Sequence, residues 1–442
     1  MVYLTKQYIR VLLLFVLAFM GYLNVQSQRP NIIYIMTDDM GYGDLSGYGR
    51  KDYITPNLDK LASQGIKFVN AYSGAAVCTP TRTAFMTGRY PARTPIGLIE
   101  PLIGEKKDTA FGLTSEYPSI ATLMRDAGYE TALIGKWHLG FLPKHSPVKN
   151  GFDYFFGFHS GAADYISHKS GPAGQRTHDL YENSILVYPE GYLTDLFSQK
   201  AVAFIKQKHE KPFFLTVTYN AAHWPWQSPG DKPYADSVDF RNGGSKAVYA
   251  SMVKSLDDGV GSIMKALDDE QLSSQTIVIF TNDNGGERYS DNGGLANSKG
   301  TLWEGGIRVP AFVRWPGKIN AGNVTQQVAI TMDWTKTILS AGGAQAHKDF
   351  PLDGIDLMPI LIGEKKDIER TLYWRTFQRS KQKAIRVGEW KYLQDEKGEY
   401  LFNLVADEGE KIDLKTKQQA IFNRLKKNYA EWEKMVLQPV PL

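Results

Sequence analysis

Five short apolar runs, which alternate with stretches of helical periodicity, are the feature that most constrains the fold. The runs are rich in β-branched and aromatic residues and occupy 31–37, 130–134, 212–219, 276–281 and 309–315. Helical patterns occupy 55–64, 119–127, 194–206, 247–267 and 333–340. Nearly continuous apolar strands that alternate with helices indicate a mostly parallel sheet sandwiched by helices. We therefore predict an α/β fold, in which ligands bind outside the carboxyl ends of the strands.

The sequence pattern changes after residue 359. Short strand patterns at 370–377, 383–387, 390–394 and 399–403 are followed by a polar helical pattern at 417–435. Short strands joined by tight turns indicate an antiparallel sheet. We predict a catalytic domain at 28–359 and a C-terminal subdomain at 360–442, made of a small antiparallel sheet and a helix.

The first residues resemble an export signal. Lys6 and Arg10 precede an apolar run over 11–23, and Ser27 fits the small residue of a cleavage site. This run is shorter than the roughly 20 residues that a membrane-spanning helix needs. We predict a signal peptide at 1–27 and a periplasmic or secreted protein with no stable membrane span after cleavage. An uncleaved anchor is the alternative.

Oxygen-bearing side chains follow two of the predicted strands. Asp38 and Asp39 come directly after the first strand, and Asp283 and Asn284 follow the fourth. Adjacent carboxylates repel each other unless a proton or a cation lies between them. Because the donors are all oxygens, we expect Ca²⁺, with Mg²⁺ as the alternative, and not Zn²⁺.

Basic side chains occur near the ends of other strands. Lys136 and His138 are two residues apart, so in an extended chain they share a face. His223 lies next to tryptophans, and Lys299 precedes glycines that let the backbone approach a ligand. Each has an ordinary structural explanation by itself. Together with a divalent cation, they indicate a site for a tetrahedral oxyanion.

Composition restricts the partners only weakly. The chain has 51 Lys and Arg against 47 Asp and Glu, a formal net charge of +4. This mild excess of positive charge is compatible with an anionic substrate, and we expect no nucleic-acid partner. The hydrophobic content of 43% is that of a globular protein.

Cys78 is the only cysteine in the chain, so it cannot form an internal disulfide. Pro80 suits the first turn of a helix, Thr79 or Cys78 suits its cap, and Gly88 suits its end. Cys78 then lies at a helix N-terminus, where backbone N–H groups favour negative charge. Arg82 follows one turn later on the same face. A buried cysteine acting as a small apolar residue is the alternative.

Six stretches carry a family resemblance: TDDMGYGD, CTPTRTAFMTGRYP, GKWHLG, HWPW, TNDNGG and SKGTLWEGGIRVP. In these stretches and their order, the chain resembles type I sulfatases, the formylglycine-dependent members of the alkaline phosphatase superfamily. Later pieces such as AIRVGEWKYL resemble the C-terminal subdomain of that family. The resemblance implies an alkaline phosphatase-like fold and the activity of a sulfuric ester hydrolase.

The resemblance assigns the nucleophile and the metal ligands. It implies that a maturation enzyme reads Pro80 and Arg82 and oxidises Cys78 to Cα-formylglycine, whose hydrate is the nucleophile. Thr81 stands where serine is commoner in the family. The implied ligands of the cation are Asp38, Asp39, Asp283, Asn284 and modified residue 78.

The resemblance also assigns the groups that handle charge and protons. Arg82 would stabilise the hydrate, and Lys136 and Lys299 would stabilise charge on the sulfate oxygens. His223 would be the general acid for the leaving alcohol. His138 would be the base that assists elimination of sulfate.

The predicted substrate is a sulfated glycan. The segment 151–169 resembles N-acetylgalactosamine-4-sulfatase-like members, in which it helps to shape the substrate side. Candidate substrate contacts are Arg93, Glu100, Ser160, Asp164, His168, Arg176 and His178. Two alternatives stay open: a phosphatase or phosphodiesterase of the same superfamily, and a non-catalytic protein that binds sulfated glycans.

Overall fold

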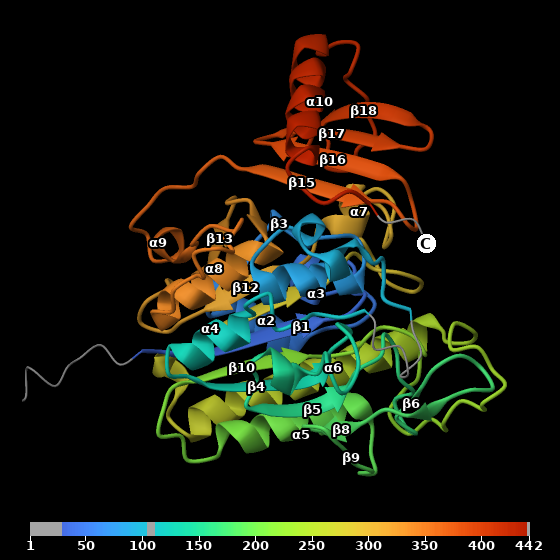
Figure 1. Cartoon of the computed structure of the whole chain (residues 1–442), viewed down its shortest axis with the longest axis vertical. Helices are drawn as coiled ribbons and strands as arrows, with labels where there is room; N and C mark the ends of the chain where they lie inside the picture. Colours follow the sequence, from blue (N-terminus) through green and yellow to red (C-terminus); the bar gives the residue numbers. More distant parts are fainter. Residues whose placement is uncertain (1–28, 104–110, 440–442) are drawn as a thin grey trace, which may run out of the picture.

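The computed structural model describes residues 29–103 and 111–439 and is built around a ten-stranded sheet (Figure 1). The strand order is β13-β2-β12-β11-β1-β10-β4-β5-β8-β9. The central strands β11, β1, β10, β4 and β5 are parallel, and antiparallel pairs flank them. The strands are β1 Asn31–Thr37, β2 Ile66–Phe68, β4 Glu130–Lys136, β5 Tyr154–Phe158, β8 Tyr181–Glu182, β9 Ile185–Leu186, β10 Phe213–Thr218, β11 Thr276–Asn282, β12 Ala311–Arg314 and β13 Asn323–Thr325. The prediction of a mostly parallel α/β sheet is confirmed.

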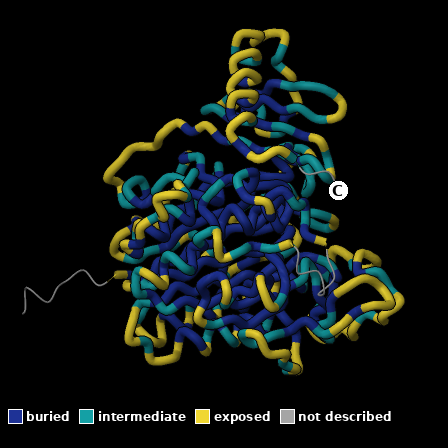
Figure 2. The backbone as a smooth tube through the Cα atoms, in the orientation of Figure 1, coloured by how far each residue is buried: buried dark blue, intermediate teal, exposed yellow. Residues whose placement is uncertain are grey.

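Helices cover both faces of this sheet. In β1, Ile33 and Ile35 pack into the apolar cluster that contains α2, α5 and α6. Ile32, Tyr34 and Met36 point to the opposite cluster, which contains α3, α4 and α8. Figure 2 shows the central strands buried between these layers. The helices are α2 Pro56–Ser63, α3 Cys78–Thr87, α4 Ile120–Asp126, α5 Leu193–Ile205, α6 Lys246–Asp269, α7 Glu304–Ile307, α8 Thr331–Gly342 and α9 Met358–Leu361.

The structure adds strands that the sequence pattern did not predict and changes the direction of one that it did. The predicted strand at 309–315 is β12, which runs antiparallel to β11 and β2. The connection from β11 includes no helix that crosses the sheet, so the chain re-enters from the carboxyl edge. β5 lies in the segment 151–169, which was predicted to shape the substrate side. It belongs to the parallel part of the sheet. Two small sheets pair β14 Ala329–Ile330 with β3 Ala71–Tyr72, and β6 Lys169–Ser170 with β7 Thr177–His178.

The C-terminal part is a four-stranded antiparallel sheet with one long helix, as predicted. It consists of β15 Thr371–Thr376, β16 Gln382–Val387, β17 Trp390–Asp395, β18 Gly398–Asn403 and α10 Gln419–Glu433. Trp374 and Leu393 of this sheet share an apolar cluster with Tyr72, Ala76 and Leu302 of the larger part. Because the two parts share this core, the boundary at residue 359 stays a prediction.

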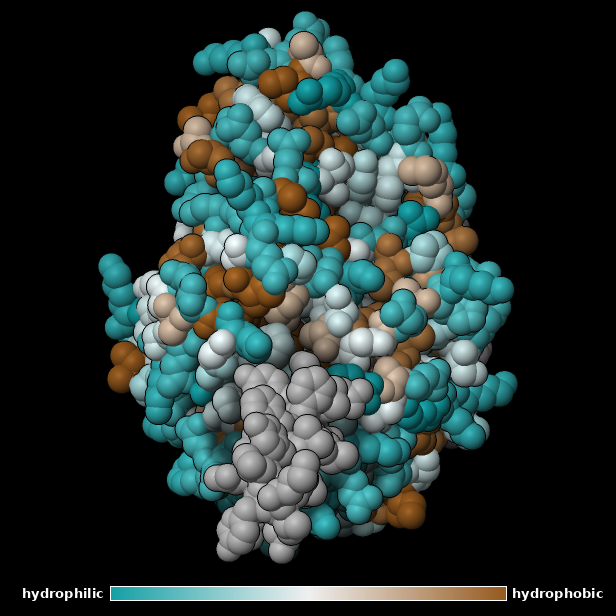
Figure 3. Space-filling model, turned by 90° about the vertical axis from the view of Figure 1, so that its left-hand side faces the viewer, coloured by the Kyte–Doolittle hydropathy of each residue, from teal (hydrophilic) through white to brown (hydrophobic). Residues whose placement is uncertain are grey.

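The surface is mixed in polarity. On the face shown in Figure 3, hydrophilic residues predominate and apolar side chains lie between them. Within residues 29–103 and 111–439, no helix is both long enough and apolar enough to cross a bilayer. The predicted signal peptide at 1–27 lies outside the described residues.

Candidate active site

Two pairs of oxygen-bearing side chains meet at the carboxyl edge of the sheet. Asp38 and Asp39 follow β1, and Asp283 and Asn284 follow β11. The two strands are hydrogen-bonded neighbours along their whole lengths, so both pairs reach the same place. All four side chains are buried. The parallel strands run towards the right-hand side of Figure 1, where this edge lies.

Hydrogen bonds connect the two pairs. Asn284 Nδ2 donates to Asp39 Oδ1 at 2.8 Å, and the Asp39 N–H donates to Asp283 Oδ1 at 3.4 Å. The φ angle of Asp39 is 59°, in the left-handed region that residues other than glycine seldom adopt. At Asp39 the backbone therefore turns away from the direction of β1.

Two of the predicted basic residues pair with these carboxylates. Arg82 Nη2 lies 3.0 Å from Asp283 Oδ2 and 3.6 Å from Asp38 Oδ2. Arg82 Nη1 also donates to the carbonyl oxygen of Lys136 at 3.0 Å. The Lys136 ammonium group donates to Asp38 Oδ2. α3 and the end of β4 therefore bring two cations to one pair of buried acids.

Lys299 reaches the site from the loop that precedes α7. Its Nζ lies 2.6 Å from Asp39 Oδ2 and 3.6 Å from Glu287 Oε2. Glu287 was not predicted as a site residue, although it follows Asn284 by only three residues. Leaving out the half-buried Glu287, three cations face three buried carboxylates, so their formal charges cancel. A divalent cation added to this set would leave it positive and able to attract an anion.

The donor set fits a hard divalent cation. Asn284 Oδ1 is buried and has no hydrogen-bond partner among the described residues, as expected for a ligand oxygen. Ligand atoms of Asp38, Asp39, Cys78 and His223 lie within 4.8 Å of one another. The carboxylate and amide oxygens suit Ca²⁺ or Mg²⁺.

The carboxylates of Asp38 and Asp283 have pKa values that are shifted in opposite directions. Although burial opposes ionisation, Lys136, His223 and Arg82 hold the pKa of Asp38 well below its ordinary value. Burial and the neighbouring Asp38 raise the pKa of Asp283 to about 7. A cation bound between them would favour the charged form of both.

Cys78 is the first residue of α3 and is 1% exposed. The N-cap is Val77, so the prediction of Thr79 or Cys78 as the cap was wrong, whereas Gly88 ends the helix with a φ of 65°. The Cys78 thiol donates to Asp38 Oδ1 at 3.4 Å. Burial and the charge of Asp38 raise the pKa of this thiol well above its ordinary value. The helix N-terminus therefore does not produce a thiolate here.

His138 lies beyond the end of β4 with a φ of 56°, so the prediction of an extended chain from Lys136 was wrong. Its Nε2 is 2.9 Å from the carbonyl oxygen of Leu102. Because a carbonyl only accepts, Nε2 carries the hydrogen and Nδ1 has the lone pair. Nδ1 is buried and finds no hydrogen-bond partner in the described part of the chain. Burial and the nearby Lys136 lower the pKa of His138 well below its ordinary value.

His223 has the opposite arrangement of its ring nitrogens. Its Nδ1 is 2.6 Å from the carbonyl oxygen of Trp224, so Nδ1 carries the hydrogen. Nε2 lies 3.5 Å from Asp39 Oδ2 and therefore points to the acidic cluster. Burial lowers the pKa of His223 to about 4. The negative charge of Asp39 acts in the opposite direction and raises this pKa.

Comparison with known proteins identifies the family. The model of the sulfatase family matches residues 30–344, and a model of the C-terminal region of N-sulphoglucosamine sulphohydrolase matches residues 296–435. The chain belongs to the sulfatase family. Arylsulfatase J of Mus musculus is 32% identical to this sulfatase over 470 residues, which cover 92% of this chain and 76% of the relative.

Two further comparisons agree with this assignment. N-acetylgalactosamine-6-sulfatase of Homo sapiens is 34% identical over 367 residues, covering 79% of this chain and 69% of the relative. The crystal structure of Ps i-CgsB in complex with k-i-k-neocarrahexaose is 31% identical with a TM-score of 0.84. The match covers 94% of this chain and 95% of that one. The prediction of a sulfatase, an enzyme that hydrolyses sulfate esters, is confirmed; the likeness to 4-sulfatases stays a prediction.

Most of the predicted substrate contacts of the sulfatase hydrogen-bond to other parts of the chain. Those in the loops that follow β5 bind neighbouring backbone or side-chain groups: Ser160 with Ser170, Asp164 with the N–H groups of Ile166, Ser167 and Tyr234, His168 with the Gly191 carbonyl, Arg176 with the carbonyls of Ala235 and Val238, and His178 with the Val187 carbonyl. These contacts order the loops of the sulfatase. A role in substrate binding stays a prediction for each of them.

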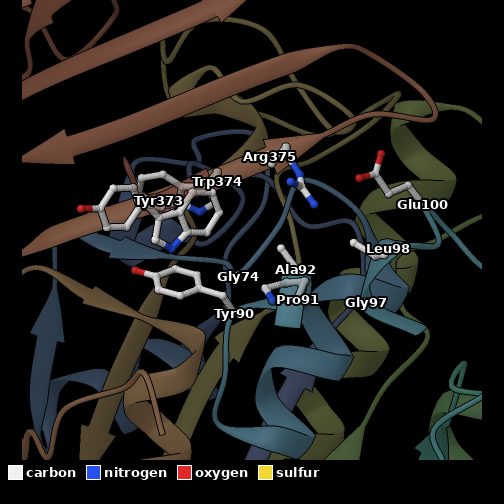
Figure 4. Close-up of a pocket in the computed structure, with 11 residues that line it drawn as sticks. Gly74, Tyr90, Pro91, Ala92, Gly97, Leu98, Glu100, Tyr373, Trp374 and Arg375 are labelled. Atoms are coloured by element: carbon white, nitrogen blue, oxygen red, sulfur yellow. The ribbon is translucent and has the colours of Figure 1, made fainter. Parts of the chain in front are cut away.

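The other two predicted contacts lie at the junction with the C-terminal sheet. Arg93 Nε lies 2.8 Å from Asp353 Oδ2, and Arg93 Nη1 donates to the carbonyl oxygen of Met435, after α10, at 3.3 Å. Glu100 Oε2 accepts the N–H groups of Phe377 and Gln378 at 2.8 and 3.0 Å. Figure 4 shows Glu100 on the wall of a junction cavity of about 20 Å³, room for about one water. The structure thus places both residues between the two parts of the sulfatase.

Asp44 connects the loops that follow β1 and β11, a role that the sequence pattern did not indicate. Its buried carboxylate accepts the N–H groups of Gly41 and Asp291 at 2.6 and 2.8 Å, and Arg50 lies 2.7 Å away. Asp44 therefore ties the loop after β1 to the loop after β11. Its place in the stretch TDDMGYGD, six residues after Asp38, was the available signal.

Proposed function

We propose that this sulfatase removes sulfate from a sulfated carbohydrate, with Cys78 converted to Cα-formylglycine and a divalent cation bound beside it. The observation that carries the proposal is the buried set of acids and cations around Cys78. Ps i-CgsB in complex with an oligosaccharide, and a relative named N-acetylgalactosamine-6-sulfatase, support a carbohydrate substrate.

The state of the thiol supports its conversion. A thiol that burial and Asp38 keep protonated is a poor nucleophile at neutral pH. Hydrated formylglycine at position 78 supplies an oxygen nucleophile in its place. A maturation enzyme that recognises Pro80 and Arg82 would form it. This enzyme is the second proposed partner, in addition to the sulfated carbohydrate.

The proposed cation is Ca²⁺, with Mg²⁺ as the alternative. When bound, it polarises a sulfate oxygen and stabilises the charge that develops there. Lys136 and Lys299 are proposed to bind sulfate oxygens, which is supported by the buried ammonium group that each carries next to a proposed ligand. The proposed ligands are Asp38, Asp39, Asp283, Asn284 and residue 78.

Two histidines are proposed to move the protons. His223 donates from Nε2 to the oxygen of the leaving alcohol. Its low pKa requires that the negative charge of a bound sulfate ester favour the protonated ring, as a nearby anion does. His138 accepts a proton at Nδ1, because the Leu102 carbonyl fixes the hydrogen on Nε2. His138 thus begins in the tautomer that its role needs, whereas His223, which carries its hydrogen on Nδ1, must first gain a proton at Nε2.

Export through the segment 1–27 completes the proposal. Its basic residues, apolar run and small residue at position 27 are those of a secretory signal. The predicted compartment is periplasmic or extracellular.

The test is desulfation by the full chain, purified from its native host. Sulfate release would be measured on k-i-k-neocarrahexaose, N-acetylgalactosamine 6-sulfate and N-acetylgalactosamine 4-sulfate, with a phosphate monoester as the competing substrate class. Mass spectrometry of the peptide that contains residue 78 would be done on the same sample, with Cys78→Ala as the inactive control. Turnover by protein whose residue 78 is still a thiol would refute the proposal. Faster hydrolysis of the phosphate ester would favour a phosphatase.

A further inference from the structure

The loop that carries Lys299 is held from both sides. The Gly300 N–H donates to the Ala76 carbonyl at 2.9 Å, on the side of α3. On the opposite side, Ser380 Oγ donates to the Gly300 carbonyl at 2.9 Å. The Leu302 N–H donates to Gln382 Oε1 at 2.6 Å. The position of Lys299 therefore depends on the C-terminal sheet as well as on the catalytic domain.

A fully buried lysine lies behind this loop. Lys391, on β17, is 0% exposed. Its Nζ lies 2.8 Å from Glu304 Oε1 and 2.8 Å from Glu410 Oε1. Glu410 Oε2 in turn accepts the Glu304 N–H at 2.6 Å. Lys391 and Glu410 thus hold both the side chain and the backbone of Glu304.

Glu304 is the first residue of α7 and follows Lys299 by five residues. Its Oε2 accepts from the Tyr72 hydroxyl at 2.6 Å. Arg308 Nη1 lies 3.7 Å from the same oxygen. Figure 1 shows α7 next to the C-terminal sheet. Glu304 is therefore fixed by β3 of the larger part and by β17 of the smaller one.

We propose that Lys391 is a positioning residue, which acts through Glu304 to hold Lys299 in place beside Asp39. This inference rests on the proposed function, in which Lys299 binds a sulfate oxygen. The connection is short: Lys391 binds Glu304, α7 starts at Glu304, and Lys299 Nζ ends 2.6 Å from Asp39 Oδ2. A displacement of about 1 Å in such a group is enough to lower the rate about 100-fold.

A matched control exists at the same junction. Arg370 Nη1 lies 2.7 Å from Asp333 Oδ2, and this pair is also buried. It joins the residue before β15 to α8, and its hydrogen bonds do not involve residues 298–304. Arg370→Met therefore breaks a buried junction pair without releasing the loop of Lys299.

The test is a double-mutant cycle on the full-length enzyme. The variants are Lys391→Met, Lys299→Ala, the double variant, Arg370→Met and Arg370→Met with Lys299→Ala. We expect Lys391→Met to lower kcat about tenfold or more with little change in KM. In the Lys299→Ala background, the same change should lower kcat by less than about twofold. Arg370→Met should change kcat by less than about twofold in either background.

The outcomes separate this inference from the proposed function. If Lys299→Ala retains normal turnover, the proposed role of Lys299 fails. If Lys299→Ala is impaired but Lys391→Met lowers kcat by the same factor in both backgrounds, the positioning role alone is refuted. Unchanged kcat in Lys391→Met refutes it as well. Should Lys391→Met not fold, Glu304→Gln, which keeps the size of the side chain but removes its charge and one of its two acceptor oxygens, decides by the same criteria.

Discussion

The balance of charge at the acidic cluster can be tested by removing Arg82. Arg82→Met removes the charged guanidinium group and keeps an unbranched side chain at this position. The three buried carboxylates then face only Lys136 and Lys299. We expect this variant to lose stability in the presence of a chelator. We also expect a divalent cation to restore part of the loss, because the cation compensates the same carboxylates.

The distances set the size of this effect. At an effective dielectric constant of about 20, a unit pair at the 3.0 Å between Arg82 and Asp283 contributes about 5.5 kcal/mol before desolvation. Removing one partner of a buried pair costs about 3–5 kcal/mol in measured cases. In a folded chain of about 400 residues, ~1 kcal/mol corresponds to ~1 °C in Tm. The expected fall in Tm is therefore about 4–6 °C.

The assay is thermal unfolding with EDTA and with excess Ca²⁺. It should be run at about pH 8.5, above the pKa of about 7 that Asp283 has in wild type, because a proton on Asp283 would compensate its charge in place of the cation. Arg370→Met, which breaks a buried pair away from the cluster, is the control. The rise in Tm on adding Ca²⁺ should be larger in Arg82→Met than in wild type or in Arg370→Met by at least ~1 °C.

An equal rise in all three proteins would refute the reasoning. It would mean that Arg82 and the cation do not act on the same carboxylates. A fall in Tm below about 1 °C for Arg82→Met with EDTA would show that the pair is not a buried one.

Three further predictions concern the nucleophile, the cation ligands and the junction. Cys78→Ala should abolish sulfate release while the circular dichroism spectrum stays that of wild type; normal turnover would exclude Cys78 as the nucleophile precursor. Asp283→Ala should weaken Ca²⁺ binding at least about tenfold in calorimetry, because a charged ligand is lost; equal affinity would rule out this ligand. Burial raises the pKa of Glu410 from 4.5 to about 7, so wild type should lose stability as pH rises through that window. Tm of Glu410→Gln should fall less than that of wild type between pH 4.5 and 7, and parallel curves would contradict the assignment.

The central sheet could be predicted because its strands carry their own signal. β1 and β11 are buried on both faces and appear in the sequence as continuous apolar runs. The direction of β12 carries no such signal, because it depends on the side from which the preceding loop enters the sheet. β5 is short, and its aromatic residues did not distinguish a strand from a loop.

A site residue could be predicted where its place directly after a parallel strand decides its location in the fold. Side chains that directly follow parallel strands must meet at one edge, as Asp38 and Asp283 do. The protonation state of Cys78 was not predictable, because it depends on burial and on Asp38, which is 40 residues away. The pairing of Lys391 with Glu304 spans 87 residues and has no local signal.

The burial of α3 has a consequence for the order of events in the cell. Every residue from Cys78 to Thr87 is buried. Asp283, Lys299 and the C-terminal sheet, which help to enclose the helix, all come later in the chain. An enzyme that needs access to the Cys78 side chain must therefore meet it before the rest of the polypeptide has closed over it. Folding speed would then compete with chemical maturation, and a molecule that closes too early would be permanently inactive although correctly shaped.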